Sequence, residues 1–540
     1  MSKLFLIGIG GTGMRCLESF IHLCAIGMMD EKEVHLLAID TDHQNGNLNR
    51  LDQLISRYIA IRTYEREQAP ARKDGYFTAR INYYKYNTEL SQKEGLITLS
   101  DKAGIRPGTV EKELADLLFS EDVQRLDLTH GYRGQTHMGS LLIYHELIDE
   151  VKKQIDLPPK DQVGKLVRFL KELRGETDAR IFITGSIFGG TGASSLPVIP
   201  KFIKDAMMLF EDPQPIDKDV EFGGTLLSSY FRFNVDDTQK KREKIIADSA
   251  FFGLNSQTAL IYYHDDPAIS KNFQYLYHIG WPINATNFHK EEAGKTLTGG
   301  MAQENPSHPT ELLSAFAAIN FFERPSIATE ARGSHTKYYR SANRIDQYFD
   351  FTFGDFSDGT RETLFEARLG TLFGFAFLLN SNSFKGDLSH FLSNVNESID
   401  GYYSSLSERD IKPLEDFLKR FAFSISDSFV PGWLFELQKS AQYDAFLFEA
   451  FAFDSSKIKT FNWGSIYKSE ERKFSFQRPV KGIKLPWRKS PDYSDAFDHF
   501  KDLFVKTYKD ERALLDRITN PKERILKHLY ITLHKAYNFE

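Results

Sequence analysis

Cysteine is scarce in this sequence, and long hydrophobic runs are missing. Only two cysteines, Cys16 and Cys24, occur among the 540 residues, and no CxxC or Cys/His cluster accompanies them. A disulfide framework and a zinc site are therefore not supported, and a reducing, cytoplasmic location is expected. The most apolar segment, 369–379 (LGTLFGFAFLL), is far shorter than the roughly 20 residues that a membrane-spanning helix needs, so we expect no membrane span.

An excess of positive over negative charge is also lacking. The net charge is −6, which gives no general electrostatic footprint for DNA or RNA, so we expect no nucleic-acid partner. The sequence contains no internal repeat and no low-complexity tract. With 540 residues the chain is too long for a single core of usual size, and we expect two or three domains.

The N-terminal part shows the pattern of a parallel α/β sheet. An apolar strand at 4–9 leads through a glycine turn into an amphipathic helix that starts near Gly13, and VHLLAIDTD (34–42) is typical of a second buried strand. Strand, turn, helix and strand in this order begin a βαβ unit. Further strands are expected at 223–233 and 258–264.

The C-terminal part has a different character. NPSHPTELLSAFAAINFFER (305–324) predicts a strongly buried central helix, and beyond a strand-like stretch at 347–356 helical patterns dominate. We therefore predict a nucleotide-binding domain over 1–324 and a mainly helical domain over 325–540. The predicted helices of this second domain cover 362–380, 388–403, 411–428, 494–517 and 520–537.

Glycine-rich turns are the main functional signal. They occur at 8–13, 131–139 and 189–192, each expected to join a buried strand to a helix. Glycine lets the backbone approach a phosphate, and the first N–H groups of the following helix are free to donate to it. In a parallel sheet all three turns would meet at the same edge, where one polyphosphate could bind. The Walker A pattern is absent, so a P-loop NTPase is excluded.

The first turn alone leaves another class open. Gly8–Gly13 contains GxGxxG between a strand and a helix, which is typical of an NAD-binding Rossmann site with Asp40 as the ribose ligand. That alternative uses only one of the three turns.

Five segments, taken in order, resemble the tubulin/FtsZ GTPase superfamily. FGGTGAS (188–194) is similar to its GGGTG(T/S)G signature, and LIGIGGTGMRCL (6–17) is similar to its N-terminal glycine loop. AIDTDHQ (38–44) resembles AINTDAQ, GYRGQTHMG (131–139) resembles the GAGANPEVG loop, and YFRFNVDDTQKKREKI (230–245) resembles TRPFxFEGRKR. The opening of the central helix, NPSHPTELL, is similar to divergent bacterial tubulin-like proteins. The resemblance implies a Rossmann-like parallel sheet of tubulin/FtsZ type.

The resemblance also implies roles for individual residues around GTP or GDP with Mg²⁺. Asp40 or Asp42 would lie near the Mg²⁺ that accompanies the nucleotide. Apart from this ion, no metal site is predicted. Arg133 stands where the family carries glycine; its guanidinium could pair with phosphate, could block the site, or could lie in solvent. The residues expected at the phosphates are Gly10, Gly11, Thr12, Gly13, Gly131, Gly134, Gly189, Gly190, Thr191, Gly192 and Ala193; those expected at the ribose are Asn234 and Asp236, and those at the guanine edge are Asn305 and Glu311.

Two functions follow from the resemblance. The first is a GTP-binding protein that self-assembles into filaments, with nucleotide at the subunit interface and GTP hydrolysis linked to assembly. In the family the catalytic acid follows the central helix in an NxDxxD loop, and no such pattern occurs after residue 324, so no catalytic residue is assigned. The second is a non-polymerising nucleotide-gated scaffold or sensor that works with protein partners, for example in a bacterial defence system.

Overall fold

The computed structural model describes most of the chain in separate stretches. These are residues 3–30, 32–42, 45–62, 74–87, 106–126, 128, 132, 134–157, 164–176, 179–211, 220–231, 249–281, 305–324, 338–341, 362–379, 387–422, 432–434, 436–437, 447–448, 476–477 and 494–536.

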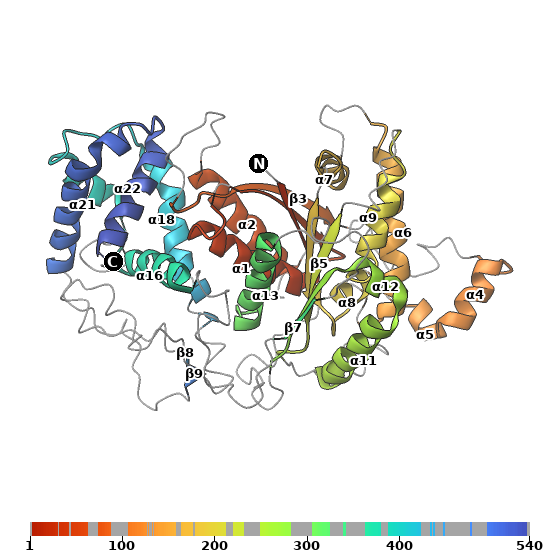
Figure 1. Ribbon diagram of the computed structural model, residues 1–540. Coiled ribbons are helices and arrows are strands. Elements are labelled where there is room, and N and C mark those ends of the chain that lie inside the picture. Colours follow the sequence, from red (N-terminus) through yellow and green to blue (C-terminus); the bar gives the residue numbers. More distant parts are fainter. Residues whose placement is uncertain are drawn as a thin grey trace.

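A seven-stranded sheet forms the centre of the molecule (Figure 1). Its order is β3-β2-β1-β4-β5-β6-β7, and every neighbouring pair is parallel. The predicted α/β class with a Rossmann-like parallel sheet is thereby confirmed. The strands are β1 (Lys3–Ile9), β2 (Glu33–Asp40), β3 (Arg80–Asn87), β4 (Arg180–Ser186), β5 (Glu221–Leu227), β6 (Tyr275–Ile279) and β7 (Tyr338–Ser341).

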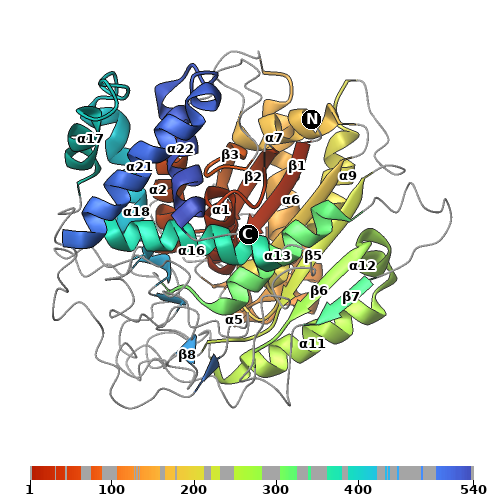
Figure 2. The ribbon, with the colours of Figure 1, turned by 60° about the vertical axis from the view of Figure 1, so that its left-hand side comes forward.

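Helices cover the sheet and continue beyond it (Figure 2). Those up to the end of the predicted central helix are α1 (Gly10–Ala25), α2 (Gly46–Ile61), α4 (Val110–Leu118), α5 (Glu121–Gln124), α6 (Thr136–Gln154), α7 (Lys165–Arg174), α8 (Thr191–Ser195), α9 (Ile199–Met207), α11 (Phe252–Asp265), α12 (Pro267–Asn272) and α13 (Pro309–Glu323). The later ones are α16 (Glu362–Leu379), α17 (Leu388–Asn396), α18 (Glu408–Ala422), α21 (Ser494–Leu515) and α22 (Pro521–Ala536). A separate two-stranded antiparallel pair consists of β8 (Leu447–Phe448) and β9 (Phe476–Gln477).

Alternation along the central strands divides the interior into two cores. In β1, Leu4 and Leu6 belong to one buried cluster, whereas Phe5 and Ile7 belong to the other. Successive side chains of a strand point to opposite faces, so a strand buried on both faces has no polar side. The first core contains α1, α2 and α13, and the second contains α6, α7 and α9.

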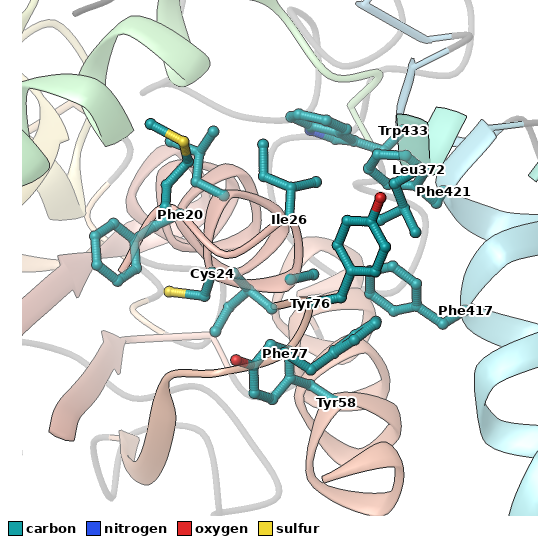
Figure 3. Packing of buried hydrophobic residues seen from close by; sticks show 14 of the residues in the cluster. Phe20, Cys24, Ile26, Tyr58, Tyr76, Phe77, Leu372, Phe417, Phe421 and Trp433 are labelled. Carbon is teal, nitrogen blue, oxygen red and sulfur yellow. The ribbon is translucent and has the colours of Figure 1, made fainter. Parts of the chain in front are cut away.

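The C-terminal helices extend the first core. Phe417 and Phe421 of α18 pack near Phe77 and the α1 side chains (Figure 3), and the Phe77 and Phe417 rings lie 4.9 Å apart edge to face. Trp433 stacks on His22 of α1 with 4.4 Å between ring centres. One buried cluster thus runs across residue 324, and the division into 1–324 and 325–540 stays a prediction.

Two expected strands differ from the structure. Residues 258–264 lie in the helix α11, where Phe252, Ser256 and Tyr263 are its buried positions. A short apolar run such as TALIYYH has no periodicity that separates a strand from a helix, so composition alone was misleading. The strand expected at 223–233 ends at Leu227, and β6, which pairs with it, was not anticipated.

Other expectations have mixed outcomes. The five C-terminal helical patterns correspond to α16, α17, α18, α21 and α22. The stretch 347–356 lies outside the described residues. Within the described part of the chain, no helix is both long and apolar enough to cross a membrane.

Candidate functional site at the carboxyl edge of the sheet

The first glycine turn connects β1 directly to α1. Gly10 has φ of +65°, in the left-handed region that favours glycine. A Cβ on Gly13 would lie 2.8 Å from the Gly8 carbonyl carbon and 2.9 Å from the Thr184 oxygen, so this glycine is required for α1 to pack closely on the sheet. Gly11 and Thr12 are partly exposed in the first turn of α1, where backbone N–H groups have no partner within the helix.

The third glycine turn follows β4 and lies against the first. Gly189 and Gly190 are partly exposed, and a Cβ on Gly192 would approach the Ser186 oxygen to 2.7 Å. A Cβ on Gly10 would lie 3.3 Å from both the Gly192 nitrogen and the Thr191 Cβ. The turns after the neighbouring strands β1 and β4 are therefore side by side, as the parallel sheet predicts.

The second glycine turn reaches the same place by a different route. It was expected to follow a buried strand, but α5 and irregular chain precede its described residues, so this expectation is wrong. Among the described residues between β3 and α6, the chain forms the helices α4 and α5 and no strand. Gly134 has φ of +82° just before α6, and Gly131 and Arg133 lie outside the described residues.

The start of α6 packs directly on the third turn. A Cβ on Gly139 would lie 2.8 Å from the Ser194 Cβ, and the Ser140 hydroxyl donates to the Ser194 carbonyl oxygen at 2.7 Å. The helix start after the second turn thus contacts α8, which in turn contacts Gly10 of the first turn. The half-exposed Ala193 lies in this short helix.

Phe188, which stands in place of a signature glycine, is a core residue. It is 2% exposed, and its ring packs at 4.9 Å from Phe252 and 5.5 Å from Phe231. The aromatic ring therefore points away from the turn that Gly189–Gly192 form.

Acidic and hydroxyl side chains follow β2 at this edge. The Asp40 carboxylate accepts from the Asp42 backbone N–H at 3.2 Å and from Asn45 Nδ2 at 3.1 Å. Burial raises the pKa of Asp40 to about 7, and the neighbouring Asp42 carboxylate acts in the same direction. The Thr41 and Thr191 hydroxyls are hydrogen-bonded at 2.8 Å, which joins this loop to the third glycine turn.

Glu311, at the start of α13, lies in a buried ion pair with Arg15 of α1. Arg15 Nε and Nη2 donate to Glu311 Oε1 and Oε2 at 2.6 and 2.9 Å. Tyr230 Oη donates to Oε1 at 2.7 Å, and the His308 backbone N–H donates to Oε2 at 2.9 Å, closing a capping box. Burial lowers the pKa of Arg15, but the Glu311 charge outweighs it, so the net pKa lies above the usual value.

This arrangement bears on base recognition. A carboxylate has about four lone-pair positions, and four donors already occupy those of Glu311. A guanine edge could bind Glu311 only if one of these donors moved away. The Asn305 backbone oxygen accepts from Arg15 Nη1, and its N–H donates to Asn47 Oδ1 at 3.2 Å. The roles of Asn305 and Glu311 at the base stay predictions.

The ion-pair network continues to the C-terminal region. Arg50 of α2 donates to Glu18 Oε1 at 2.7 Å and to Glu436 Oε1 at 2.8 Å. Glu436 Oε2 accepts from both the backbone N–H and the hydroxyl of Ser307 at 3.0 Å. The segment before α13 is therefore held by α1, α2 and a residue from beyond position 430.

Three polar residues of this edge were missed by reasoning from the sequence: Thr41, Asn45 and Asn47. Asn45 caps α2, because its Oδ1 accepts from the Asn47 backbone N–H at 2.9 Å. The signal was present as NGN followed by the apolar pattern of a helix, which marks a helix start. Asn234 and Asp236 lie outside the described residues.

The edge is suited to binding an anion. Within the described stretches, no group of three or more His, Cys, Asp or Glu side chains could hold a metal ion by itself. The cysteines are free and buried, and burial raises the pKa of Cys16 to about 12, so its thiol is unreactive at neutral pH. The described groups at this edge are helix N–H groups, glycine turns and hydroxyls, which are typical of a phosphate site, together with the Asp40 and Asp42 carboxylates.

The chain shows similarity to known proteins among solved structures only. No family model and no curated protein matches the sequence. Among solved structures, the chain is similar to CetZ2 from Haloferax volcanii, described as a GTPgS-bound protofilament, with 12% sequence identity and a TM-score of 0.24. The match covers 59% of this chain and spans 59% of the length of the CetZ2 chain.

Proposed function

We propose that this chain binds a guanine nucleotide, GTP or GDP with Mg²⁺, at the carboxyl edge of its sheet. The observation that carries the proposal is the contact between two glycine turns, Gly10 against Thr191 and Gly192. Each turn begins a helix at the end of a buried strand, so their N–H groups converge on one place. An NAD-binding Rossmann site would need only the turn at 8–13 and would leave the turn at 189–192 without a role.

The residues present fit the phosphates of such a ligand. Gly10 adopts a positive φ, and Gly11 is partly exposed beside the amides of Asn45 and Asn47. Backbone N–H groups of the first turns of α1 and α8 would donate to phosphate oxygens, with the Thr191 hydroxyl beside them. Asp40 and Asp42 would lie toward Mg²⁺, which would supply charge neutralisation of the phosphates.

We extend the proposal to self-assembly into filaments, with nucleotide between subunits and hydrolysis linked to growth. This extension rests on the resemblance of the five sequence segments to the tubulin/FtsZ superfamily. The second candidate is a non-polymerising nucleotide-gated scaffold with protein partners, and the missing NxDxxD pattern after residue 324 favours it.

Nucleotide extraction and electron microscopy test these proposals. The purified protein should release guanine nucleotide on denaturation or bind added GDP. Recovery of NAD, or an extract without nucleotide together with no binding of added GDP, would overturn the main proposal. Filaments with GTP but not with GDP would select the assembling protein. Discrete particles under both conditions would select the scaffold.

A further inference from the structure

The side-chain NH₂ group of Asn47 is a buried hydrogen-bond donor that no described residue accepts from. Its side chain belongs to the start of α2 and is 3% exposed. Its Oδ1 accepts from Arg15 Nη1 at 3.3 Å and from the Asn305 backbone N–H at 3.2 Å. Its Nδ2 is buried and has no hydrogen-bond partner among the residues that the structure describes.

The two bonds to Oδ1 determine the orientation of the amide. Arg15 Nη1 and a backbone N–H can only donate, so the atom that faces them must be the oxygen. Flipping the amide would bring two pairs of donors together. The NH₂ group is therefore held on the opposite side, and a buried donor left unpaired costs about 1–3 kcal/mol.

The unpaired donor lies at the first glycine turn. Asn47 Nδ2 is 3.1 Å from the position that a Cβ on Gly11 would occupy, and Asn45 Nδ2 is 3.2 Å from the same point. Gly11 is in the first turn of α1, a helix of 16 residues whose N-terminal N–H groups also have no acceptor within the helix. Asn45 Nδ2 already donates to Asp40, which leaves the Asn47 donor and the helix N–H groups to be satisfied.

We propose that Asn47 is a ligand-binding residue whose Nδ2 donates to a phosphate oxygen of the nucleotide bound at the start of α1. This inference rests on the proposed function and adds to it a phosphate contact from the loop after β2. Donors converging at a positive helix end call for an acceptor with negative charge, and a phosphate oxygen supplies it. The Arg15–Glu311 pair then acts as a positioning element, because Arg15 fixes the Asn47 amide.

The test exchanges this donor for a carboxylate oxygen of the same shape. In Asn47→Asp, one oxygen still accepts from Arg15 and Asn305, and the other lies at the positive end of α1, so folding should be unimpaired. The same oxygen would repel a phosphate. We expect the Kd for GDP, measured by titration calorimetry on the full chain, to rise about 10- to 100-fold, while the melting temperature stays the same or rises.

Two further variants make the result decisive. Asn49→Asp places the same charge on the same helix at a half-exposed position and should change the Kd less than about threefold. Asn47→Ala removes the donor without adding a charge and should also weaken GDP binding, which covers the case that Asn47→Asp does not fold.

The outcomes separate this inference from the proposed function. If the wild-type protein binds GDP and both Asn47→Asp and Asn47→Ala bind it equally well, Asn47 is not a ligand and only the inference is overturned. If Asn49→Asp weakens binding as much as Asn47→Asp, the effect is one of net charge and the inference is also overturned. If the wild-type protein binds no guanine nucleotide, the proposed function is overturned together with the inference.

Discussion

The carboxyl edge of the sheet and the C-terminal helical region are built on opposite principles. At the edge, small residues bring backbones together, and groups such as Asn47 Nδ2 are left without partners. In the helical region, aromatic rings fill the interior, as where Phe504 stacks on His528 with 3.6 Å between ring centres. Unsatisfied donors are typical of a surface that awaits a ligand, and dense aromatic packing is typical of a structural support.

The two regions are nevertheless joined. Arg50 and Ser307 bind Glu436, and the same buried cluster contains β1 and α22. We infer that the carboxyl edge depends on the helical region for its shape. The reverse dependence is weaker, because the glycine turns contribute few core side chains. The following predictions test this difference.

The largest effect is expected from Thr191→Arg at the binding edge. The Thr191 Cβ lies 3.3 Å from the Cβ position of Gly10, so a long side chain would occupy the place between the two turns. We expect loss of measurable nucleotide binding with little change in melting temperature, because Thr191 is partly exposed. Thr191→Ser, which retains the hydroxyl bonded to Thr41, is the matched control and should bind normally.

Phe417→Ala should have the largest effect on stability. This ring is 1% exposed between Phe77 and Phe421, and removing it leaves a cavity. We expect destabilisation by about 3 to 5 kcal/mol in urea unfolding. If the two regions share one core, the sheet and the helices will unfold in a single transition, both in the wild-type protein and in Phe417→Ala. Two separate transitions would instead support independent domains at 1–324 and 325–540.

Glu311→Gln distinguishes positioning from base recognition. The substitution leaves Arg15 buried without its counter-charge, and we expect destabilisation by about 3 kcal/mol. If Glu311 only fixes Arg15, the preference for GDP over ADP will remain unchanged at a temperature where the variant is folded. A selective loss of GDP affinity would show that the carboxylate reads guanine.

Acidification by a single pH unit should have the smallest effect and act on the helical region. Burial lowers the pKa of His528 to about 3, and its ring bonds the Tyr403 hydroxyl and the Phe504 carbonyl oxygen while neutral. The unfolded chain takes up this proton near pH 6.5 and the folded chain does not, so stability falls as pH decreases from about 6.5 toward 3. We expect about 1 kcal/mol lost per pH unit.

Hydrogen exchange can locate this effect. Amides of α21 and α22 should lose protection between pH 7 and pH 5.5 after correction for the intrinsic exchange rate. His528→Phe should reduce the dependence but not abolish it, because burial also lowers the pKa of His534 in α22, to about 4. The exposed substitution His390→Phe should leave the dependence unchanged. If His528→Phe leaves it unchanged as well, the dependence belongs to other groups.

The elements predictable from the sequence are those with strong local patterns. The buried strands at 4–9 and 34–42, the glycine turns and the helix at 305–324 follow from apolar periodicity and from glycine in tight turns. The strand expected at 258–264 was wrong because seven apolar and polar residues cannot distinguish α11 from a strand. The strand β6 was missed for a different reason: it forms by pairing with β5, which lies far from it in the sequence.

The sequence by itself determined that the first and third glycine turns follow buried parallel strands, because backbone conformation and helix N-termini are local properties. Only the tertiary structure decided which groups meet there. It placed Thr191 beside Gly10, used all acceptor positions of Glu311, and left the amide of Asn47 unpaired. Hydrogen-bond satisfaction depends on partners far apart in the chain, such as Arg15 and Asn305, and no local pattern encodes it.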